Sequence, residues 1–421
     1  MNAVSQTSLQ ASAASFRARY EGLKERLGGD SIQRAEAADA FAHQGLPGPR
    51  EEAWHYTALR PLTEVAFHEP VVLLSDCAAA LAALPDLGMP RLVFVDGRFR
   101  ADLSDAVTGA TLRTGAPAFG PSVALGEKMV ALNAMLAEDG AAITVAPGVD
   151  AGAVMLVSLG SDAHGVPVSF HPRHSVVLGA GARLTLVEVN GGTGVYFNNP
   201  VLVAEVAEDA TLTHLRIQQE AAGAFHISTV LADVQARGTY DSFTLALGGR
   251  LSRVEVHAAL LGEKAMAHLN AAQLLGGVQH SDFTTIVRHD APATASRQTV
   301  KNVLTGRSKG VFQGKIEVAR VAQKTDGYQM NQTLLLSGDA EIDSKPQLEI
   351  YADDVKCSHG ATVGELDADQ LFYLRSRGVP EAQARNILVR AFLSEALDPI
   401  EHEGARAAME AAIAAWWERQ A

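Results

Sequence analysis

Gly181-Ala-Arg-Leu-Thr-Leu-Val187 is the first of four similar stretches that decide the fold of this chain. Each has a turn and then alternating residues, as in Asp209-Ala-Thr-Leu-Thr-His-Leu215, Arg237-Gly-Thr-Tyr-Asp-Ser-Phe243 and, less cleanly, Gly262-Glu-Lys-Ala-Met-Ala-His-Leu269. Their first residues are 28, 28 and 25 positions apart. A repeat of this length without a helix suits a solenoid, because each coil buries its apolar face only against neighbouring coils. We therefore predict a parallel β-helix, with a large β-sandwich as the alternative.

The repeats belong to a long segment of uniform texture that starts near Thr144, in which β-branched runs alternate with Gly, Asp and Asn. Ahead of it, apolar residues at helical spacing predict an amphipathic helix that stops at Gly28-Gly29: Phe16, Tyr20, Leu23 and Leu27. After Gly364 the pattern becomes helical again. We expect a mainly β protein with three parts, namely an α-rich N-terminal domain (1–144), a β-helix core (145–362) and a helical C-terminal domain (363–421).

Composition limits the class of function. The chain has 421 residues, of which 47% are hydrophobic and 20% charged, so a globular protein is expected. Its 35 Lys and Arg against 48 Asp and Glu give a net charge of -13, which argues against binding to nucleic acid or to an anionic membrane. Two cysteines, no export signal and no long apolar run indicate a cytoplasmic protein that does not span a membrane.

Motifs for common enzymatic chemistry are absent. The segment Gly310-Val-Phe-Gln-Gly-Lys315 superficially resembles a phosphate-binding loop, but three residues separate its glycines and Ile316 follows the lysine. A nucleotide-binding loop needs four intervening residues and then Ser or Thr. The sequence also lacks a Gly-x-Ser-x-Gly elbow and a His-Glu-x-x-His helix. No ATPase or hydrolase signature is therefore present.

A few isolated histidines and a cysteine are of the residue types that can bind a metal. His164, His171 and His174 lie close in sequence, but Pro172 interrupts the run and no cysteine or paired carboxylate accompanies them. We interpret them as solvated histidines in loops or at coil edges. Cys77 lies in an Ala-rich stretch and is interpreted as a packing residue of a helix.

A candidate site lies near the end of the β segment, within Leu348-Glu-Ile-Tyr-Ala-Asp-Asp-Val-Lys-Cys-Ser-His-Gly360. On a strand the period of two places Cys357 and His359 on one face. A thiolate and an imidazole are suitable ligands for iron or zinc, yet they are half of the four that a closed site or an iron-sulfur cluster takes. The missing ligands would come from another chain. The alternative is a buried cysteine beside a surface histidine.

The C-terminal domain is expected to contain three helices, and the last, from about Glu403, carries Trp416 and Trp417. Adjacent helical residues point about 100° apart, so the two indoles cannot both face one narrow seam. One of them is left for a protein partner, because large aromatic residues anchor many interfaces. Other apolar residues of these helices suit the covering of the last coil: Leu371, Phe372, Ile387, Leu388 and Phe392.

The stretch from His289 to Arg377 strongly resembles the SufB/SufD family of iron-sulfur cluster assembly proteins. The residues that carry the resemblance are His289-Asp-Ala-Pro, Ser296-Arg-Gln298, Gly310-Val-Phe-Gln-Gly-Lys-Ile316, Ala322-Gln-Lys-Thr-Asp326, Gln329, Leu334-Leu-Leu-Ser337, Lys345-Pro-Gln-Leu-Glu-Ile350 and Leu371-Phe-Tyr-Leu-Arg-Ser-Arg-Gly378. Glu52-Ala-Trp-His-Tyr-Thr57 is similar to a segment near the start of the D-type members. Cys357-Ser-His-Gly360 resembles the D type as well, since B-type members carry Glu-His-Glu-Ala there.

This resemblance implies a right-handed parallel β-helix between helical ends, paired with a SufB-like paralogue through the β-helices. It also implies that a separate SufC-type ABC ATPase binds the C-terminal helices, with Leu371, Phe372, Trp416 and Trp417 as candidate contacts, while this chain binds no nucleotide. Cys357 and His359 would lie at the paralogue interface and help to hold iron or a transient iron-sulfur cluster. Because both ligands bind deprotonated, assembly should weaken as the pH falls. Whether the chain forms a homodimer when alone is left open.

Two classes of function remain at this point. The first is a non-catalytic subunit of a SUF scaffold for cluster assembly. The second is a β-helix enzyme that acts on polysaccharide, in which Asp353 and Asp354 supply acid and base. Adjacent strand residues face opposite sides, so this carboxylate pair converges poorly. The sequence favours the scaffold.

Overall fold

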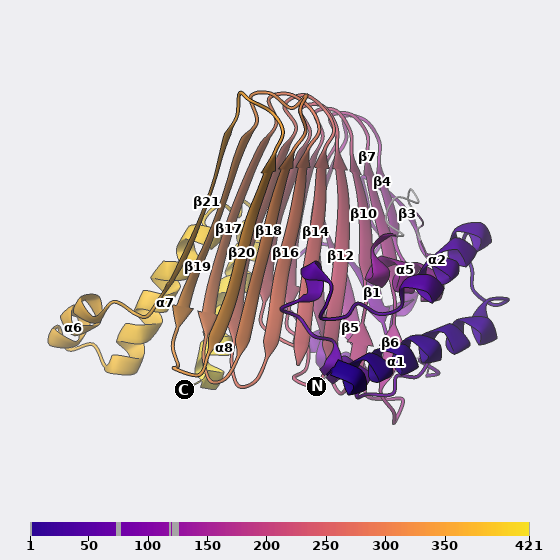
Figure 1. The fold of residues 1–421 in the computed structure, drawn as a ribbon, viewed down its shortest axis with the longest axis horizontal. Helices are drawn as coiled ribbons and strands as arrows, with labels where there is room; N and C mark the ends of the chain where they lie inside the picture. The colour runs from indigo at the N-terminus through magenta and orange to yellow at the C-terminus, as the bar shows by residue number, and fades with distance from the viewer. Residues whose placement is uncertain (1, 73–76, 118, 120–125, 421) are drawn as a thin grey trace.

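Two long sheets of mainly parallel strands form the body of the protein in the computed structural model, which describes residues 2–72, 77–117, 119 and 126–420 (Figure 1). Within these residues sheet A contains, in spatial order, β20 (Glu341–Ile350), β18 (Lys309–Val318), β16 (His280–His289), β14 (Leu251–Leu260), β12 (Phe225–Val234), β10 (Val201–Val206), β7 (Arg173–Leu178), β4 (Ala142–Val145) and β3 (Thr111–Arg113), with β6 (Val168–Phe170) and β9 (Tyr196–Asn198) beside them. Sheet B contains β2 (Arg98–Phe99), β1 (Arg91–Val95), β5 (Asp150–Gly160), β8 (Arg183–Gly192), β11 (Thr211–Gln218), β13 (Thr239–Ala246), β15 (Met266–Leu275), β17 (Ala295–Leu304), β19 (Asp326–Leu335) and β21 (Lys356–Gly364).

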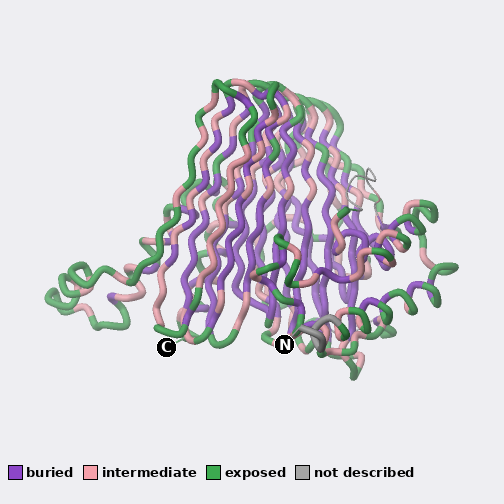
Figure 2. Tube along the Cα trace, in the orientation of Figure 1, coloured by how far each residue is buried: buried purple, intermediate pink, exposed green. Residues whose placement is uncertain are grey.

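The chain passes alternately through the two sheets, so the predicted solenoid is confirmed and the sandwich alternative is wrong. Each strand pairs in parallel with the strand one coil later, as Thr211 does with Thr239 and Thr239 with Met266. Figure 2 shows that buried residues run along most strands, whereas the last coil is more exposed.

One column of turns keeps the coils in register. It consists of residues with positive φ, which are Gly181, Asp209, Arg237, Lys264, Ala293 and Lys324. The backbone N–H of each donates to a carbonyl of the next coil, for example Arg237 to Glu263 at 2.9 Å and Lys264 to Pro292 at 3.1 Å. These hydrogen bonds hold non-glycine residues in a conformation that L-residues otherwise avoid.

The sequence pattern places the turn of the fourth repeat at Gly262, which is two residues too early. Its turn residue is Lys264, 27 positions after Arg237, and not Gly262. Gly262 is needed for a different reason: a Cβ at this position would lie 2.0 Å from the backbone nitrogen of Ala236. The glycine permits close contact between coils and does not mark the left-handed turn.

The inward faces of the two sheets form a core that is mainly apolar, although the early coils also enclose a polar pair in which His214 Nε2 lies 2.9 Å from Glu188 Oε2. Its apolar members include Leu186, Leu212, Val256, Leu269 and Phe312. In the later coils amides replace aliphatic side chains on the inner face of sheet B. Gln273 donates to Asn302 at 2.9 Å, and Asn302 donates to Asn331 at 2.7 Å. The amides are therefore linked by hydrogen bonds along the solenoid axis, although Gln273 Oε1 has no hydrogen-bond partner among the described residues.

The N-terminal elements lie mainly against the outer face of sheet A (Figure 1). They are α1 (Asn2–Leu23), α2 (Ser31–Gln44), η1 (Glu52–Trp54), α3 (Arg60–Thr63) and α5 (Lys128–Leu136). Two further short elements, α4 (Ala78–Ala82) and η2 (Ala101–Leu103), lie between α3 and β3 in the sequence. Helix α1 ends at Leu23, before the predicted stop at Gly28-Gly29, and buries Phe16 and Tyr20.

The C-terminal helices are α6 (Ala368–Ser376), α7 (Glu381–Leu397) and α8 (Glu403–Gln420). Val389 and Leu393 of α7 and Ile413 of α8 pack against the outer face of sheet B, where Leu215 and Phe243 contribute to the same cluster. The expectation that these helices cover the last coil is therefore wrong. The outer face of sheet B is itself a row of apolar side chains, and it provides a larger apolar surface to bury. Among the described residues no helix combines the length and apolar character that a bilayer span requires.

The Gly262→Ala substitution should destabilise the solenoid by about 3 kcal/mol, because the added methyl group overlaps the neighbouring coil. Gly338→Ala is the matched control, since a Cβ there meets nothing within 4 Å. Chemical denaturation followed by circular dichroism measures both. Equal stability of the two variants would show that the coils are not in the close contact described.

Candidate functional site

The last coil leaves one end of the solenoid open. Among the described residues β20 pairs only with β18, and β21 pairs only with β19, so each presents a free backbone edge. Apolar side chains are exposed at the same end: Ile350 is 39% exposed, Tyr351 64% and Val363 53%. Free strand edges together with exposed apolar side chains are typical of a surface that pairs with another chain.

Cys357 and His359 lie on β21 at this open end, on the same face of the strand, as the sequence predicted. In the register of sheet B they follow Gly327 and Gln329 of β19, whose side is buried. Cys357 is partly buried and His359 is exposed. The pair therefore points to the interior side of the sheet, but no later coil covers it.

Gly327, which has no side chain, leaves the space in which the thiol of Cys357 lies. Its Sγ lies 3.3 Å from the position that a Cβ of Gly327 would occupy. It also packs beside an apolar cluster that contains Ile316 and Val318. Burial raises the pKa of this thiol, a hydrogen bond from the Gly327 backbone partly offsets the effect, and the Asp326 carboxylate adds to it. The thiol therefore tends to stay protonated until a base removes its proton or a metal cation displaces the proton to solvent.

A shallow hollow of about 360 Å³ adjoins Cys357 and Ser358. Tyr328 and Lys356 line it together with an exposed ion pair in which Arg297 Nη2 lies 2.9 Å from Asp326 Oδ2. Solvent can therefore reach this part of the strand without passing through the core.

The three histidines interpreted as solvated are instead buried, so that interpretation is wrong. His164 Nε2 lies 2.9 Å from Asp96 Oδ2, and its side chain has no exposed surface. Burial lowers the pKa of His171 to about 3 and that of His174 to about 4, which keeps both rings neutral. Coil stacking encloses this region, an effect that the local sequence does not reveal. In the described chain the three rings do not converge with carboxylates on a metal site.

Two other expectations are only partly met: Cys77 packs as predicted but precedes α4 and is not inside a helix, and Asp353 and Asp354 lie in a turn and not on a strand. The segment Gly310–Lys315 is part of strand β18 and forms no loop. Cys77 is 7% exposed and packs in the apolar cluster on the outer face of sheet B. Asp353 and Asp354 are exposed in the turn between β20 and β21.

The candidate partner contacts in the C-terminal helices divide into two groups. Trp416 is 2% exposed and packs against sheet B, while the adjacent Trp417 is partly exposed. Helix α6 has no buried residue among those described, and it extends away from the body of the molecule (Figure 1). Phe372 on this helix is 73% exposed and Tyr373 is 56% exposed, whereas Leu371 is partly buried.

Sequence reasoning missed a polar network on the outer face of sheet A. The segment Glu52–Thr57 crosses this face, where the Trp54 ring lies 4.2 Å from the Arg253 guanidinium carbon and Thr57 donates to Asp282. Arg253 also pairs with Glu255 at 2.9 Å. The available signal was the alternation of Arg253, Glu255 and His257, which places all three on one face of β14.

These observations define a parallel β-helix protein with a thiol and an imidazole at an open end suited to a second chain. Residues 160–392 match the family model "SUF system FeS cluster assembly, SufBD core domain". The chain is 34% identical to the iron-sulfur cluster assembly protein SufD of Escherichia coli, over 89% of this chain and 90% of that protein.

Two further relatives agree with this match. A SufBD family protein of Synechocystis, slr0076, is 33% identical over 88% of each chain. Protein ABCI7 of Arabidopsis chloroplasts is 36% identical over 55% of this chain and 50% of its own length. The chain belongs to the SufBD family of iron-sulfur cluster assembly proteins, and within it to the SufD type.

Alkylation of Cys357 should be slow at neutral pH and should rise at a higher pH than in the denatured chain, because the native pKa is raised and the thiolate is the reactive form. Peptide mass spectrometry after iodoacetamide treatment separates Cys357 from the buried Cys77. A native profile at or below the pH of the denatured profile would contradict the described burial of the thiol.

Proposed function

We propose that this protein is a non-catalytic subunit of a SUF scaffold, which pairs with a SufB-like paralogue and helps to build or load iron-sulfur clusters at their interface. The observation that carries the proposal is the placement of Cys357 and His359 together at the open end of the solenoid. Because the chain belongs to a family of cluster assembly proteins, the ligand proposed for this pair is iron or an iron-sulfur cluster. The polysaccharide enzyme receives no comparable support, since its two aspartates lie in an exposed turn.

Edge pairing is the proposed mode of association with the paralogue. A partner strand placed beside β20 or β21 would continue the parallel or antiparallel ladder and satisfy the free backbone groups. The same contact would cover Ile350, Tyr351 and Val363, whose exposure is unfavourable in an isolated chain. Without the paralogue, a second copy of this chain offers the same kind of edge.

The ligand count requires an interface. An iron-sulfur cluster is held by about four protein ligands, and this chain supplies one thiolate and one imidazole at the open end. The paralogue would provide the rest, and cluster release would then follow when the two chains separate or shift. Cys357 must lose its proton to bind iron, so loading is expected to decrease as the pH falls.

A separate ATPase of the SufC type is the second proposed partner, with α6 as its docking element. The exposed Phe372 and Tyr373 suit an interface anchor, and Arg377 stacks on Tyr373 at 5.0 Å from the ring centre. Trp417 is partly exposed and can contribute at the margin, whereas the buried Trp416 holds α8 on sheet B. The ATPase would act on the scaffold through these helices, and nucleotide chemistry would remain in that subunit.

Cys357→Ala and His359→Ala should each abolish cluster assembly in cells while the fold and the complex with the paralogue persist, because each removes a ligand without removing buried core. Complementation of an assembly-deficient strain measures the loss, and co-purification measures the complex. Ser358→Ala, on the opposite face of the same strand, is the control. Wild-type assembly by the double variant would refute the proposed site.

Phe372→Ala should weaken ATPase binding at least tenfold with little change in thermal stability, since the ring is exposed. Trp416→Ala should instead lower stability by about 3 kcal/mol, as expected for a buried tryptophan. Pull-down and calorimetry on both variants make the comparison. If Phe372→Ala leaves ATPase affinity unchanged, α6 is not the docking element.

A further inference from the structure

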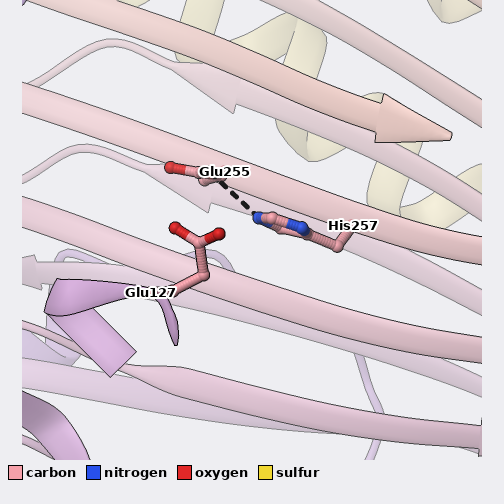
Figure 3. Close-up of side chains that lie close together, drawn as sticks. All are labelled: Glu127, Glu255 and His257. Carbon is pink, nitrogen blue, oxygen red and sulfur yellow. Dashed lines mark hydrogen bonds and ion pairs between the residues drawn. The ribbon is translucent and has the colours of Figure 1, made fainter. Parts of the chain in front are cut away.

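Three side chains capable of binding a metal meet between the N-terminal elements and sheet A, far in sequence from the open end. Glu127 directly precedes α5, while Glu255 and His257 lie on the outer face of β14 (Figure 3). One ligand atom from each lies within 4.8 Å of the other two. The Glu127 carboxylate points toward the other two side chains, as Figure 3 shows.

The pair on β14 is already arranged as two metal ligands would be. His257 Nε2 lies 2.9 Å from Glu255 Oε1, and Arg253 donates to the other oxygen, Glu255 Oε2, at 2.9 Å. Arg253 therefore fixes the carboxylate and leaves Oε1 facing the imidazole. A cation that replaces the proton shared by this pair would have one oxygen and one nitrogen ligand with little movement of either residue.

Glu127 is the unexplained member of the group. Within the described chain its carboxylate has no hydrogen bond or ion pair, although it faces a second carboxylate. A carboxylate placed in this way is unfavourable unless a cation balances it.

The surrounding charges leave a deficit of positive charge. Two cations, Arg253 and Lys128, face this region with four carboxylates: Glu51, Glu127, Glu255 and Asp282. Lys128 is bound to Glu51 at 2.8 Å, and Arg253 is shared between Glu255 and Asp282. Leaving the His257 imidazole aside, the four carboxylates outnumber the two cations by two, and one divalent cation would balance this difference.

We propose that Glu127, Glu255 and His257 form a binding site for a divalent first-row metal ion such as Zn²⁺, distinct from Cys357 and His359. Two carboxylates and an imidazole form a three-ligand set that leaves one position for water. Ligand atoms in such a site are roughly 3.5 Å apart at bond lengths of about 2.1 Å, so a small rotation of the partly exposed Glu127 completes it. Bound metal would join α5 to β14 and fix the N-terminal elements on sheet A.

The test uses tag-free full-length protein in which Cys357→Ala and His359→Ala remove the ligands at the open end. Isothermal titration with Zn²⁺ gives affinity and stoichiometry, Co²⁺ absorption reports the coordination geometry, and thermal unfolding reports stabilisation. Glu127→Gln and His257→Gln remove one ligand each. Glu255 is left intact because its loss would leave Arg253 buried without this partner.

The matched control is Asp241→Asn, which alters another histidine–carboxylate pair, with His268 Nδ1 and Asp241 Oδ1 3.9 Å apart. We expect one Zn²⁺ per chain, a rise in melting temperature, and affinity at least tenfold lower in Glu127→Gln and His257→Gln but unchanged in Asp241→Asn. Absence of saturable binding would overturn the proposal and leave His257 as a protonated bridge between carboxylates. Equal binding by all variants would overturn it as well.

Discussion

Backbone hydrogen bonds between successive coils set the spacing on which every other feature of this molecule depends. Because each turn residue donates to the coil that follows, as Lys264 does to Pro292, equivalent positions stack in straight columns. A residue's face is then decided by its place in the column and not by its neighbours in sequence. Apolar columns form most of the core, and the amides of Gln273, Asn302 and Asn331 form a hydrogen-bonded ladder along the solenoid axis.

The same regularity explains why the candidate metal ligands lie at the end of the repeat. In an inner coil a polar residue that points inward lies between two neighbouring coils and can bond to them, as Asn302 does to Gln273 and Asn331. The last coil has a neighbour on one side only, so Cys357 and His359 occupy core positions without being enclosed. Gly327 adds the space in which the sulfur lies. The site is thus a part of the inner face of the solenoid that no further coil covers.

Local sequence predicted the solenoid and the shared face of Cys357 and His359, because periodicity alone determines these features, but it assigned Phe372 to the covering of the last coil, whereas the ring is exposed. It misplaced the fourth turn, since Lys264 adopts a conformation for which glycine is the expected signal. It also missed what depends on contact between distant segments. The burial of His174 by later coils and the meeting of Glu127 with β14 follow from tertiary stacking, which a single sequence window does not contain.

The two ends of the solenoid differ in a way that limits the size of any assembly. At the early end the sheets finish in short antiparallel strands, β2 with two residues and β3 with three, which offer little backbone for continued pairing. Long open strands occur at the other end. If two chains paired through these open ends, only the ends with short strands would remain exposed. No third chain could then add by strand pairing, and assembly would stop at a dimer. A solenoid with both ends open would instead form filaments.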